Sequence, residues 1–320
     1  MISVRHIFGP VPSRRLGPSL GVDVIPFKTC SFDCVYCQLG RTTCKTTTRD
    51  SFVDIEELLA ELKRVLPGVK ANYITFSGSG EPTLNLDLGR LIGKVKELTS
   101  IPVAVLTNSS LLGYPEVRKE LLDADLVIPS LDAASQEVFE RINRPYPGLK
   151  ISEIIAGIEA FSLDFKGKFW VEVMVVKGMN DDEMELARIS SILRGINAEK
   201  IQLNTVERPP AESFAKPLTE DEMERVKHYF DERAEIITVP GNRQTFVGQP
   251  GVEESDMKAK CGQILSLLKR RPCTITDVAN GLGLNMNETS KFLGMLLNLG
   301  LIDSDSLADG KTYFYRCRGK

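Results

Sequence analysis

Hydrophobic and polar positions in the first 240 residues alternate between strand-like and helix-like patterns. Nearly continuous apolar runs predict strands at 21–27, 73–77, 103–107, 126–131, 169–177 and 200–204. Between them, apolar residues recur every three or four positions and predict helices at 54–66, 85–98, 115–122, 152–161 and 182–193. A further helix is predicted at 219–233 and a short strand at 235–239.

The order of these elements indicates an α/β fold. Strands separated by helices are typical of parallel β/α units, and strands that are apolar throughout are expected to be buried on both faces. Six units fall short of the eight that close a full barrel. We therefore predict a partial (β/α)6 barrel over residues 1–240, with a doubly wound sheet as the alternative.

A second, smaller unit is predicted at residues 257–320, after a linker at 241–256 that is rich in Gly and Pro. Helical patterns at 263–270, 274–281 and 287–299 precede strands at 302 and 313–316, around a tip at 308–310. This order is typical of a winged-helix domain.

Length and composition are those of a soluble globular protein. The chain has 320 residues, of which 42% are hydrophobic and 26% charged. No apolar run approaches the roughly 20 residues of a membrane helix, and the N-terminus has no apolar signal core. We expect a cytoplasmic protein with no membrane partner.

The net charge of −3 hides an asymmetry, because the segment from Met257 onward holds ten Lys and Arg residues against five Asp and Glu residues. The helix expected to enter a nucleic-acid groove begins with Asn287, Glu288, Thr289, Ser290 and Lys291, a poor phosphate-binding face. Most of the positive charge lies elsewhere, at Lys269, Arg270, Arg271, Lys311, Arg316 and Arg318. A protein partner or self-association is therefore favoured over RNA or DNA for this unit.

Three of the seven cysteines lie in one short segment, Cys30-Ser-Phe-Asp-Cys34-Val-Tyr-Cys37. Three thiolates on one loop can hold three corners of a cubane iron–sulfur cluster, which leaves a fourth iron open to a ligand. A structural zinc site is the alternative, but it needs four ligands, and Cys44 completes no familiar zinc pattern. The spacing of Cys261, Cys273 and Cys317 matches no auxiliary-cluster motif.

The C-x-x-x-C-x-x-C spacing, with the aromatic Tyr36 before the third cysteine, resembles the loop of the radical S-adenosylmethionine (SAM) superfamily. The resemblance implies a 4Fe–4S cluster on Cys30, Cys34 and Cys37 whose open iron chelates SAM. It also implies reductive cleavage of SAM to a 5′-deoxyadenosyl radical, and hence oxidoreductase chemistry. An electron donor such as flavodoxin or ferredoxin is then expected.

Further positions carry the same resemblance over roughly residues 20–210. Ser79, Gly80 and Glu81 are similar to the family's Gly-Gly-Glu motif, whose backbone binds the SAM amino group; a simple turn is the alternative. Four polar residues at strand ends or on a strand are expected to contact SAM, with capping or ion pairing as the alternative: Asn108, Ser130, Asp132 and Glu172. No catalytic side chain is assigned.

The run from Gly9 to Gly21 resembles an uncharacterised subgroup distantly similar to the radical SAM enzymes of wybutosine synthesis on tRNA. Its Arg14 and Arg15 suit a phosphate or carboxylate, or salt bridges to the acidic body. Arg141, Arg144 and Arg208 also fall near strand or helix ends, but the sequence does not bring them together.

Two functions remain open at this point. One is a radical SAM enzyme that modifies RNA or a phosphorylated molecule. The other is an iron–sulfur, redox-responsive regulator that binds DNA. The enzyme is favoured because a sensor needs no SAM pocket. The C-terminal unit is expected to deliver or recognise the substrate, and deleting 257–320 is predicted to leave basal SAM cleavage intact.

Overall fold

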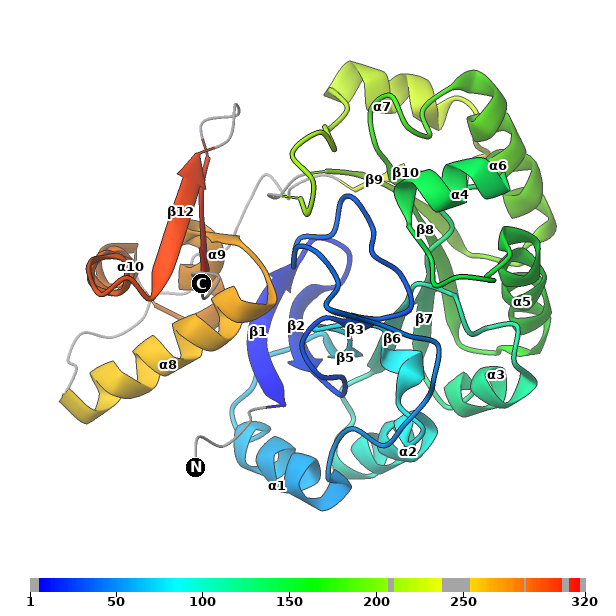
Figure 1. Cartoon of the computed structure of the whole chain (residues 1–320). Coiled ribbons are helices and arrows are strands. Elements are labelled where there is room, and N and C mark those ends of the chain that lie inside the picture. The colour runs from blue at the N-terminus through cyan, green and yellow to red at the C-terminus, as the bar shows by residue number, and fades with distance from the viewer. Residues whose placement is uncertain (1–5, 207–209, 238–253, 285, 307–310, 317–320) are drawn as a thin grey trace.

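The computed structural model describes residues 6–206, 210–237, 254–284, 286–306 and 311–316. Its centre is an eight-stranded sheet in the order β1-β2-β5-β6-β7-β8-β9-β10. Strand β1 runs antiparallel to β2, and every other neighbouring pair is parallel. Helices α1 to α7 follow one another in an arc around the sheet (Figure 1). The predicted α/β fold with a mostly parallel sheet is confirmed.

The strands lie close to the predicted apolar runs. The sheet consists of β1 (Ile7–Ser13), β2 (Gly17–Val22), β5 (Tyr73–Phe76), β6 (Val103–Thr107), β7 (Leu126–Pro129), β8 (Lys168–Val175), β9 (Lys200–Thr205) and β10 (Ala234–Ile236). Two short strands, β3 (Thr29–Cys30) and β4 (Cys44–Lys45), pair in parallel beside the cysteine segment.

The first strand differs from the prediction. The run 21–27 was expected to be a strand, but β2 ends at Val22, since its pairing with β5 covers only Ser19–Val22 and Pro26 lacks a backbone donor. The preceding N-terminal run forms β1 and makes a hairpin with β2. The turn of this hairpin places Arg14 and Arg15 at the end of the sheet.

The helices also follow the predicted periodicity. They are α1 (Ile55–Val65), α2 (Leu88–Leu98), α3 (Pro115–Leu121), α4 (Gln136–Ile142), α5 (Ile151–Asp164), α6 (Glu183–Gly195) and α7 (Glu220–Lys227), with a 3-10 turn at Pro82–Leu84. The sequence did not predict α4. Asp54 caps α1 by accepting a hydrogen bond from the Glu57 backbone N–H at 2.9 Å.

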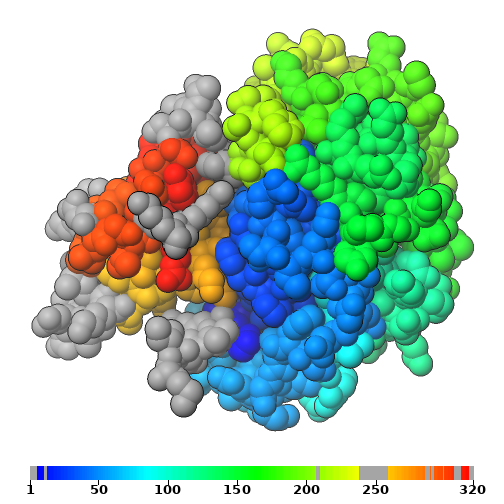
Figure 2. Space-filling model, viewed as in Figure 1, coloured from blue at the N-terminus to red at the C-terminus, as the bar shows by residue number. Residues whose placement is uncertain are grey.

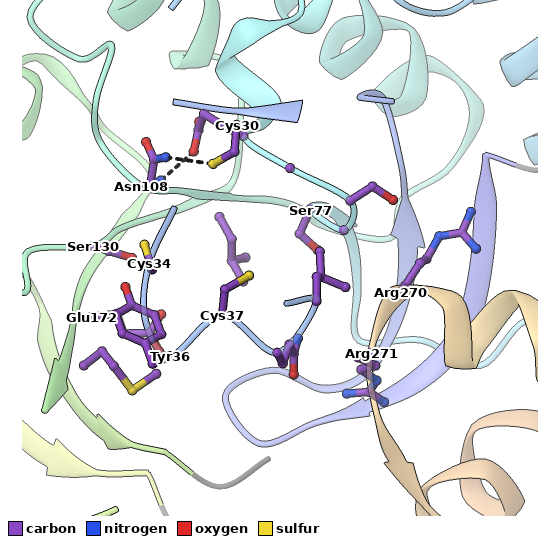
Figure 3. A pocket seen from close by; sticks show the side chains of 18 of the residues that line it. Cys30, Cys34, Tyr36, Cys37, Ser77, Asn108, Ser130, Glu172, Arg270 and Arg271 are labelled. Carbon is purple, nitrogen blue, oxygen red and sulfur yellow. Dashed lines mark hydrogen bonds between the residues drawn. The ribbon is translucent and has the colours of Figure 1, made fainter. Parts of the chain in front are cut away.

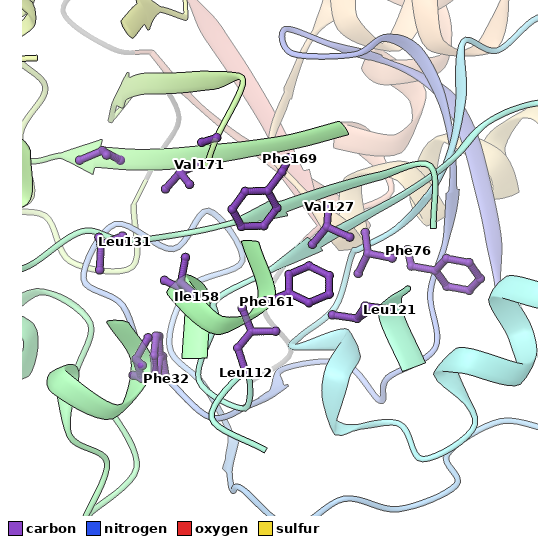
Figure 4. Packing of buried hydrophobic residues seen from close by; sticks show 14 of the residues in the cluster. Phe32, Phe76, Leu112, Leu121, Val127, Leu131, Ile158, Phe161, Phe169 and Val171 are labelled. Atoms are coloured by element: carbon purple, nitrogen blue, oxygen red, sulfur yellow. The ribbon is translucent and has the colours of Figure 1, made fainter. Parts of the chain in front are cut away.

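The core lies between the sheet and these helices (Figure 4). Strand residues such as Val105 and Val173 are completely buried, as expected for parallel strands covered on both faces. Phe161 of α5 packs edge-on against Phe169 of β8, with ring centroids 5.7 Å apart. This contact packs α5 against the amino end of β8.

The C-terminal unit contains α8 (Glu254–Arg270), β11 (Cys273–Thr274), α9 (Ile275–Leu282), α10 (Met286–Asn298), β12 (Ile302–Ser306) and β13 (Thr312–Arg316). The three strands form an antiparallel sheet in the order β11-β13-β12. The predicted helices and the last two strands occur in the predicted order, but β11 was not predicted and α8 begins at Glu254, inside the predicted linker. The winged-helix identity of the unit stays a prediction. The predicted tip at 308–310 and most of the linker lie outside the described residues.

The C-terminal unit packs directly on the N-terminal hairpin. Phe8 of β1 shares a hydrophobic cluster with Ile264 and Leu267 of α8 and Val278 of α9. Figure 2 shows the orange segment of this unit against the blue N-terminal segment. Within α10, Thr289 is completely buried.

In the part of the chain that the structure describes, no helix has the length and apolar character to cross a membrane.

Candidate active site

A cavity of about 380 Å³ opens at the carboxyl ends of the parallel strands. It is lined by the β1–β2 turn, the cysteine segment, residues 77–81, the ends of β6 to β9 and the end of α8. Figure 3 shows Cys37 near its centre, Ser130 and Glu172 on one side, and Arg270 and Arg271 on the other. The fold therefore gathers all of the predicted site residues except Asp132 at the position where β/α proteins bind ligands.

Cys30, Cys34 and Cys37 all line this cavity. Two side-chain amides approach the sulfur atoms, since Asn108 Nδ2 lies 3.4 Å from Cys30 Sγ and Asn143 Nδ2 lies 3.5 Å from Cys34 Sγ. Amide donors of this kind orient metal-binding thiolates and tune them.

The three thiols are not spaced like the ligands of a single ion. Among the described residues, no three His, Cys, Asp or Glu side chains are close enough to hold one metal ion. A cubane cluster binds each thiolate through a different iron, so its ligands stand further apart than those of one zinc ion.

Burial raises the pKa of each of these thiols. The pKa of Cys30 rises to about 12, chiefly through burial and then through the charge of Glu81. Burial also raises the pKa of Cys34 and of Cys37, while the charge of Lys28 lowers the pKa of Cys37. Thiolates in such a place need a compensating positive charge, which the iron atoms of a cluster supply.

The segment Ser79-Gly80-Glu81 passes beside the cysteine loop. A Cβ atom on Gly80 would overlap the backbone oxygen of Thr29, so only glycine fits this approach. Asp23 holds the preceding residue by accepting hydrogen bonds from the Ser79 backbone N–H at 3.2 Å and from the Ser79 hydroxyl. The segment lines the cavity in this fixed position, and its contact with the SAM amino group stays a prediction.

Glu81 is buried and does not offer a free carboxylate to a ligand. Its oxygens accept hydrogen bonds from the hydroxyls of Thr83 and Thr107, both at 2.6 Å, and from the Asn108 backbone N–H at 2.7 Å. Burial raises the pKa of Glu81, and the hydrogen bonds from Thr107 and Thr83 oppose that rise. Glu81 therefore ties the 79–81 segment to the end of β6.

We expect Gly80→Ala to reduce SAM affinity strongly, by about tenfold or more, because the methyl group must displace the Thr29 backbone. The measurement is SAM binding to the anaerobically reconstituted protein. Gly93→Ala is the matched control, because the Gly93 site in α2 is open and SAM affinity should not change. Equal SAM affinity for Gly80→Ala and the wild type would contradict the close approach.

Asn108 and Ser130 both line the cavity, as predicted. The Asn108 side chain is turned toward the cysteine loop, where Nδ2 donates to Ser31 Oγ at 2.9 Å as well as contacting Cys30. The Ser130 backbone oxygen accepts a hydrogen bond from the Ser109 hydroxyl at 2.8 Å. Asn108 therefore supports the loop that carries the thiols.

Asp132 was predicted to contact SAM, but in the structure it lies behind the cysteine loop and does not line the cavity. Its oxygens accept hydrogen bonds from the Tyr36 hydroxyl, from Asn143 Nδ2 at 2.7 Å and from the Met174 backbone N–H at 2.9 Å. Burial raises the pKa of Asp132 to about 6. Asp132 thus anchors Tyr36, the residue next to Cys37.

Glu172 of β8 reaches the cavity and pairs with Arg15 of the hairpin turn. It also accepts a hydrogen bond from Asn204 Nδ2 at 2.8 Å. The pocket-facing position and the ion pair, which the sequence posed as alternatives, occur together. Glu172 joins the N-terminal hairpin to strands β8 and β9.

Cationic side chains from both ends of the chain meet at the cavity. Arg14 and Arg15 of the hairpin turn, Lys28, and Arg270 and Arg271 at the end of α8 all line it. Both Arg pairs stood out in the sequence, but no pattern in it indicated that segments so far apart would meet.

The remaining candidates lie elsewhere. Arg144 pairs with Glu212 at 2.5 Å and is not a lining residue, and Arg141 donates to the backbone oxygen of Met179. Cys44 is exposed and Cys273 is buried, and neither lines the cavity. Arg208, Cys317 and Arg318 lie outside the described residues.

Comparison with protein families gives a match to the radical SAM superfamily over residues 24–188. A UPF0026 protein of Methanocaldococcus jannaschii is 38% identical over 228 residues, which cover 70% of this chain and 71% of that protein. A Brachyspira hyodysenteriae protein named GTPase Obg is 40% identical over 94% of this chain, but the chain spans only 44% of that longer protein. A relative of lower sequence identity is the RNA methyltransferase RlmN of Aliarcobacter butzleri. It is 26% identical over 74% of this chain and 66% of its own length.

Solved structures show the same fold at low sequence identity. TYW1 with a lysine–pyruvate adduct bound aligns with a TM-score of 0.51 at 18% identity, over 71% of this chain and 76% of that one. A radical SAM methyltransferase from Sphaerobacter thermophilus aligns with a TM-score of 0.51 at 19% identity, over 68% of this chain and 65% of that one.

Proposed function

Because this chain belongs to the radical SAM superfamily, whose enzymes use a 4Fe–4S cluster and SAM, we propose that Cys30, Cys34 and Cys37 hold that cluster. The observation that carries the assignment is the convergence of the three thiols and the glycine-dependent 79–81 segment on one cavity. Superfamily membership also makes the protein an enzyme that cleaves SAM, in agreement with the expectation from the sequence.

In this proposal the cluster and SAM, when bound, supply a one-electron cleavage that yields a 5′-deoxyadenosyl radical. The residues of the chain bind SAM and orient it beside the cysteine loop. The backbone of Ser79 and Gly80 receives the SAM amino group, and Ser130 and Glu172 contact the rest of SAM. Tyr36 and Asn108 keep the cysteine loop in place through Asp132 and Ser31. An electron donor such as flavodoxin or ferredoxin provides the reducing electron.

We further propose that the substrate is RNA or another phosphorylated molecule. The gathering of Arg14, Arg15, Arg270 and Arg271 at the cavity supports this, because guanidinium groups match phosphate oxygens in pairs. The distant relative RlmN carries the name of an RNA methyltransferase. A DNA-binding redox regulator, the alternative from the sequence, would not need a cavity of this kind beside the cluster.

The decisive test of the enzyme assignment is anaerobic. The protein is reconstituted with iron and sulfide, SAM and dithionite are added, and 5′-deoxyadenosine is measured. We expect 5′-deoxyadenosine from the wild type and none from Cys37→Ala. A wild type with an intact cluster that binds no SAM would overturn the proposed site.

A further inference from the structure

An exposed aromatic ring, Phe27, directly precedes the cavity-lining Lys28 and has two lysine ammonium groups near it. Phe27 is 38% exposed, although it is a large hydrophobic residue. The Lys28 Nζ lies 5.6 Å from the centre of its ring, and the Lys269 Nζ lies 5.4 Å from it. The two lysines come from opposite ends of the chain, so the packing of α8 on the hairpin creates this group.

Phe27, Lys28 and Lys269 are linked through Lys28 to the arginines that line the cavity. Lys28 belongs to both sets, since its ammonium group lies near the Phe27 ring and it lines the cavity, as Arg271 does. Its backbone has a φ of 62°, in the left-handed region that a lysine rarely adopts, and its backbone N–H donates to the Ser79 oxygen at 2.6 Å. The fold therefore fixes the position of Lys28 beside the proposed SAM-binding segment.

Positive charge outweighs negative charge along this rim. Five cationic side chains line the cavity, against Glu81 and Glu172. Glu81 accepts hydrogen bonds from Thr83, Thr107 and Asn108. Glu172 pairs with Arg15, and Arg270 pairs with the buried Asp23 behind the rim. Burial, followed by the nearby charges of Arg316 and Arg270, lowers the pKa of Lys269. Like charges held this close favour an anionic partner.

Together these features match a single strand of nucleic acid. Proteins that bind single strands combine a cationic path for the phosphates with aromatic rings on which bases stack. A small ligand with a single phosphate would need only one or two of these cations to bind it. It would not need an exposed aromatic ring. The basic residues involved lie at the end of α8 and on the loop after β2, not on the first turn of α10.

We propose that Phe27, Lys28, Lys269 and Arg271 form the binding rim for single-stranded RNA, with one base stacked on Phe27 and the neighbouring phosphates on the cations. The target nucleotide then enters the cavity beside the proposed SAM site. This inference rests on the proposed function and names the substrate class and the residues that recognise it. It also gives the C-terminal unit a direct part in the active site.

The test uses the full chain, reconstituted anaerobically, and a fluorescent unstructured RNA 12-mer whose binding is followed by anisotropy over a salt series. Phe27→Ala should weaken binding by about fivefold or more, and Phe27→Tyr, which keeps the ring, should stay within about twofold of the wild type. Lys269→Gln should reduce the slope of log affinity against log salt by about 0.7. The control Lys63→Gln, on the distant helix α1, should change neither quantity.

Three results would overturn the inference. They are no RNA binding at low salt, equal binding by Phe27→Ala and the wild type, and competition by a mononucleotide or by DNA as effective as that by the same RNA. The 5′-deoxyadenosine assay on the wild type separates this inference from the proposed function. If 5′-deoxyadenosine forms but RNA does not bind, only the inference about the RNA-binding rim is refuted. If SAM does not bind, the proposed active site itself is refuted.

Discussion

Replacing Cys34 with Ala is expected to abolish assembly of a normal cluster and, with it, SAM cleavage. Cys34 lies at the cavity between Cys30 and Cys37 in the loop, and Asn143 approaches its sulfur at 3.5 Å. No other described cysteine lines the cavity, so none is placed to replace it. We expect at least a hundredfold loss of 5′-deoxyadenosine formation, measured together with iron content and the visible absorbance of the cluster.

Cys44→Ala is the matched control for Cys34→Ala. Cys44 lies in the same region of the chain but is exposed and outside the cavity lining, so iron content and SAM cleavage should match the wild type. A normal cluster in the Cys34→Ala protein would refute the ligand assignment. Loss of the cluster in the Cys44→Ala protein would instead support a fourth protein ligand and a different kind of site.

Replacing Arg270 with Ala is expected to destabilise the protein and to weaken SAM binding together. Arg270 Nε lies 3.2 Å from Asp23 Oδ2 in a buried ion pair, and its guanidinium group lies 4.5 Å from the centre of the Phe8 ring. The variant leaves Asp23 buried without this partner, which typically costs about 3–5 kcal/mol of the free energy of unfolding. Asp23 also holds Ser79, so the effect should reach the SAM-binding segment.

The test combines denaturant unfolding with SAM titration. The double variant Asp23→Asn, Arg270→Met removes both charges, so it should lose less stability than Arg270→Ala alone. Arg64→Ala, at an exposed position on α1, is the control and should shift the free energy of unfolding by less than about 0.5 kcal/mol. Arg270→Ala with unchanged unfolding and unchanged SAM affinity would show that the ion pair does not support the site.

The same contacts change what is expected from removal of the C-terminal unit. Sequence reasoning treated residues 257–320 as a separate recognition domain whose loss would leave basal SAM cleavage intact. In the structure, Phe8 packs in the cluster of α8 and α9, and Arg270 pairs with Asp23 beside Ser79. Truncation would expose Phe8 and leave Asp23 without Arg270, so it should impair SAM binding at least as much as Arg270→Ala does.

The sequence by itself determined the fold class and the chemistry of the cysteine loop. Apolar runs such as 103–107 correspond to buried parallel strands because burial on both faces demands continuous hydrophobicity. The spacing of Cys30, Cys34 and Cys37 is local, so it could be interpreted before any long-range contact was known. The glycine at position 80 was also recognisable from the sequence as part of a motif. The physical reason for it, the close approach of the Thr29 backbone, became visible only in the structure.

Only the tertiary structure decided which side chains meet across the fold. Asp132 looked like a ligand-binding residue because it follows a strand, yet its hydrogen bonds turn it toward Tyr36 and away from the cavity. Arg15 meets Glu172, and Arg270 meets Asp23, across separations of 157 and 247 residues. Local periodicity carries no information about such pairs, because they depend on how the hairpin and α8 pack against the sheet.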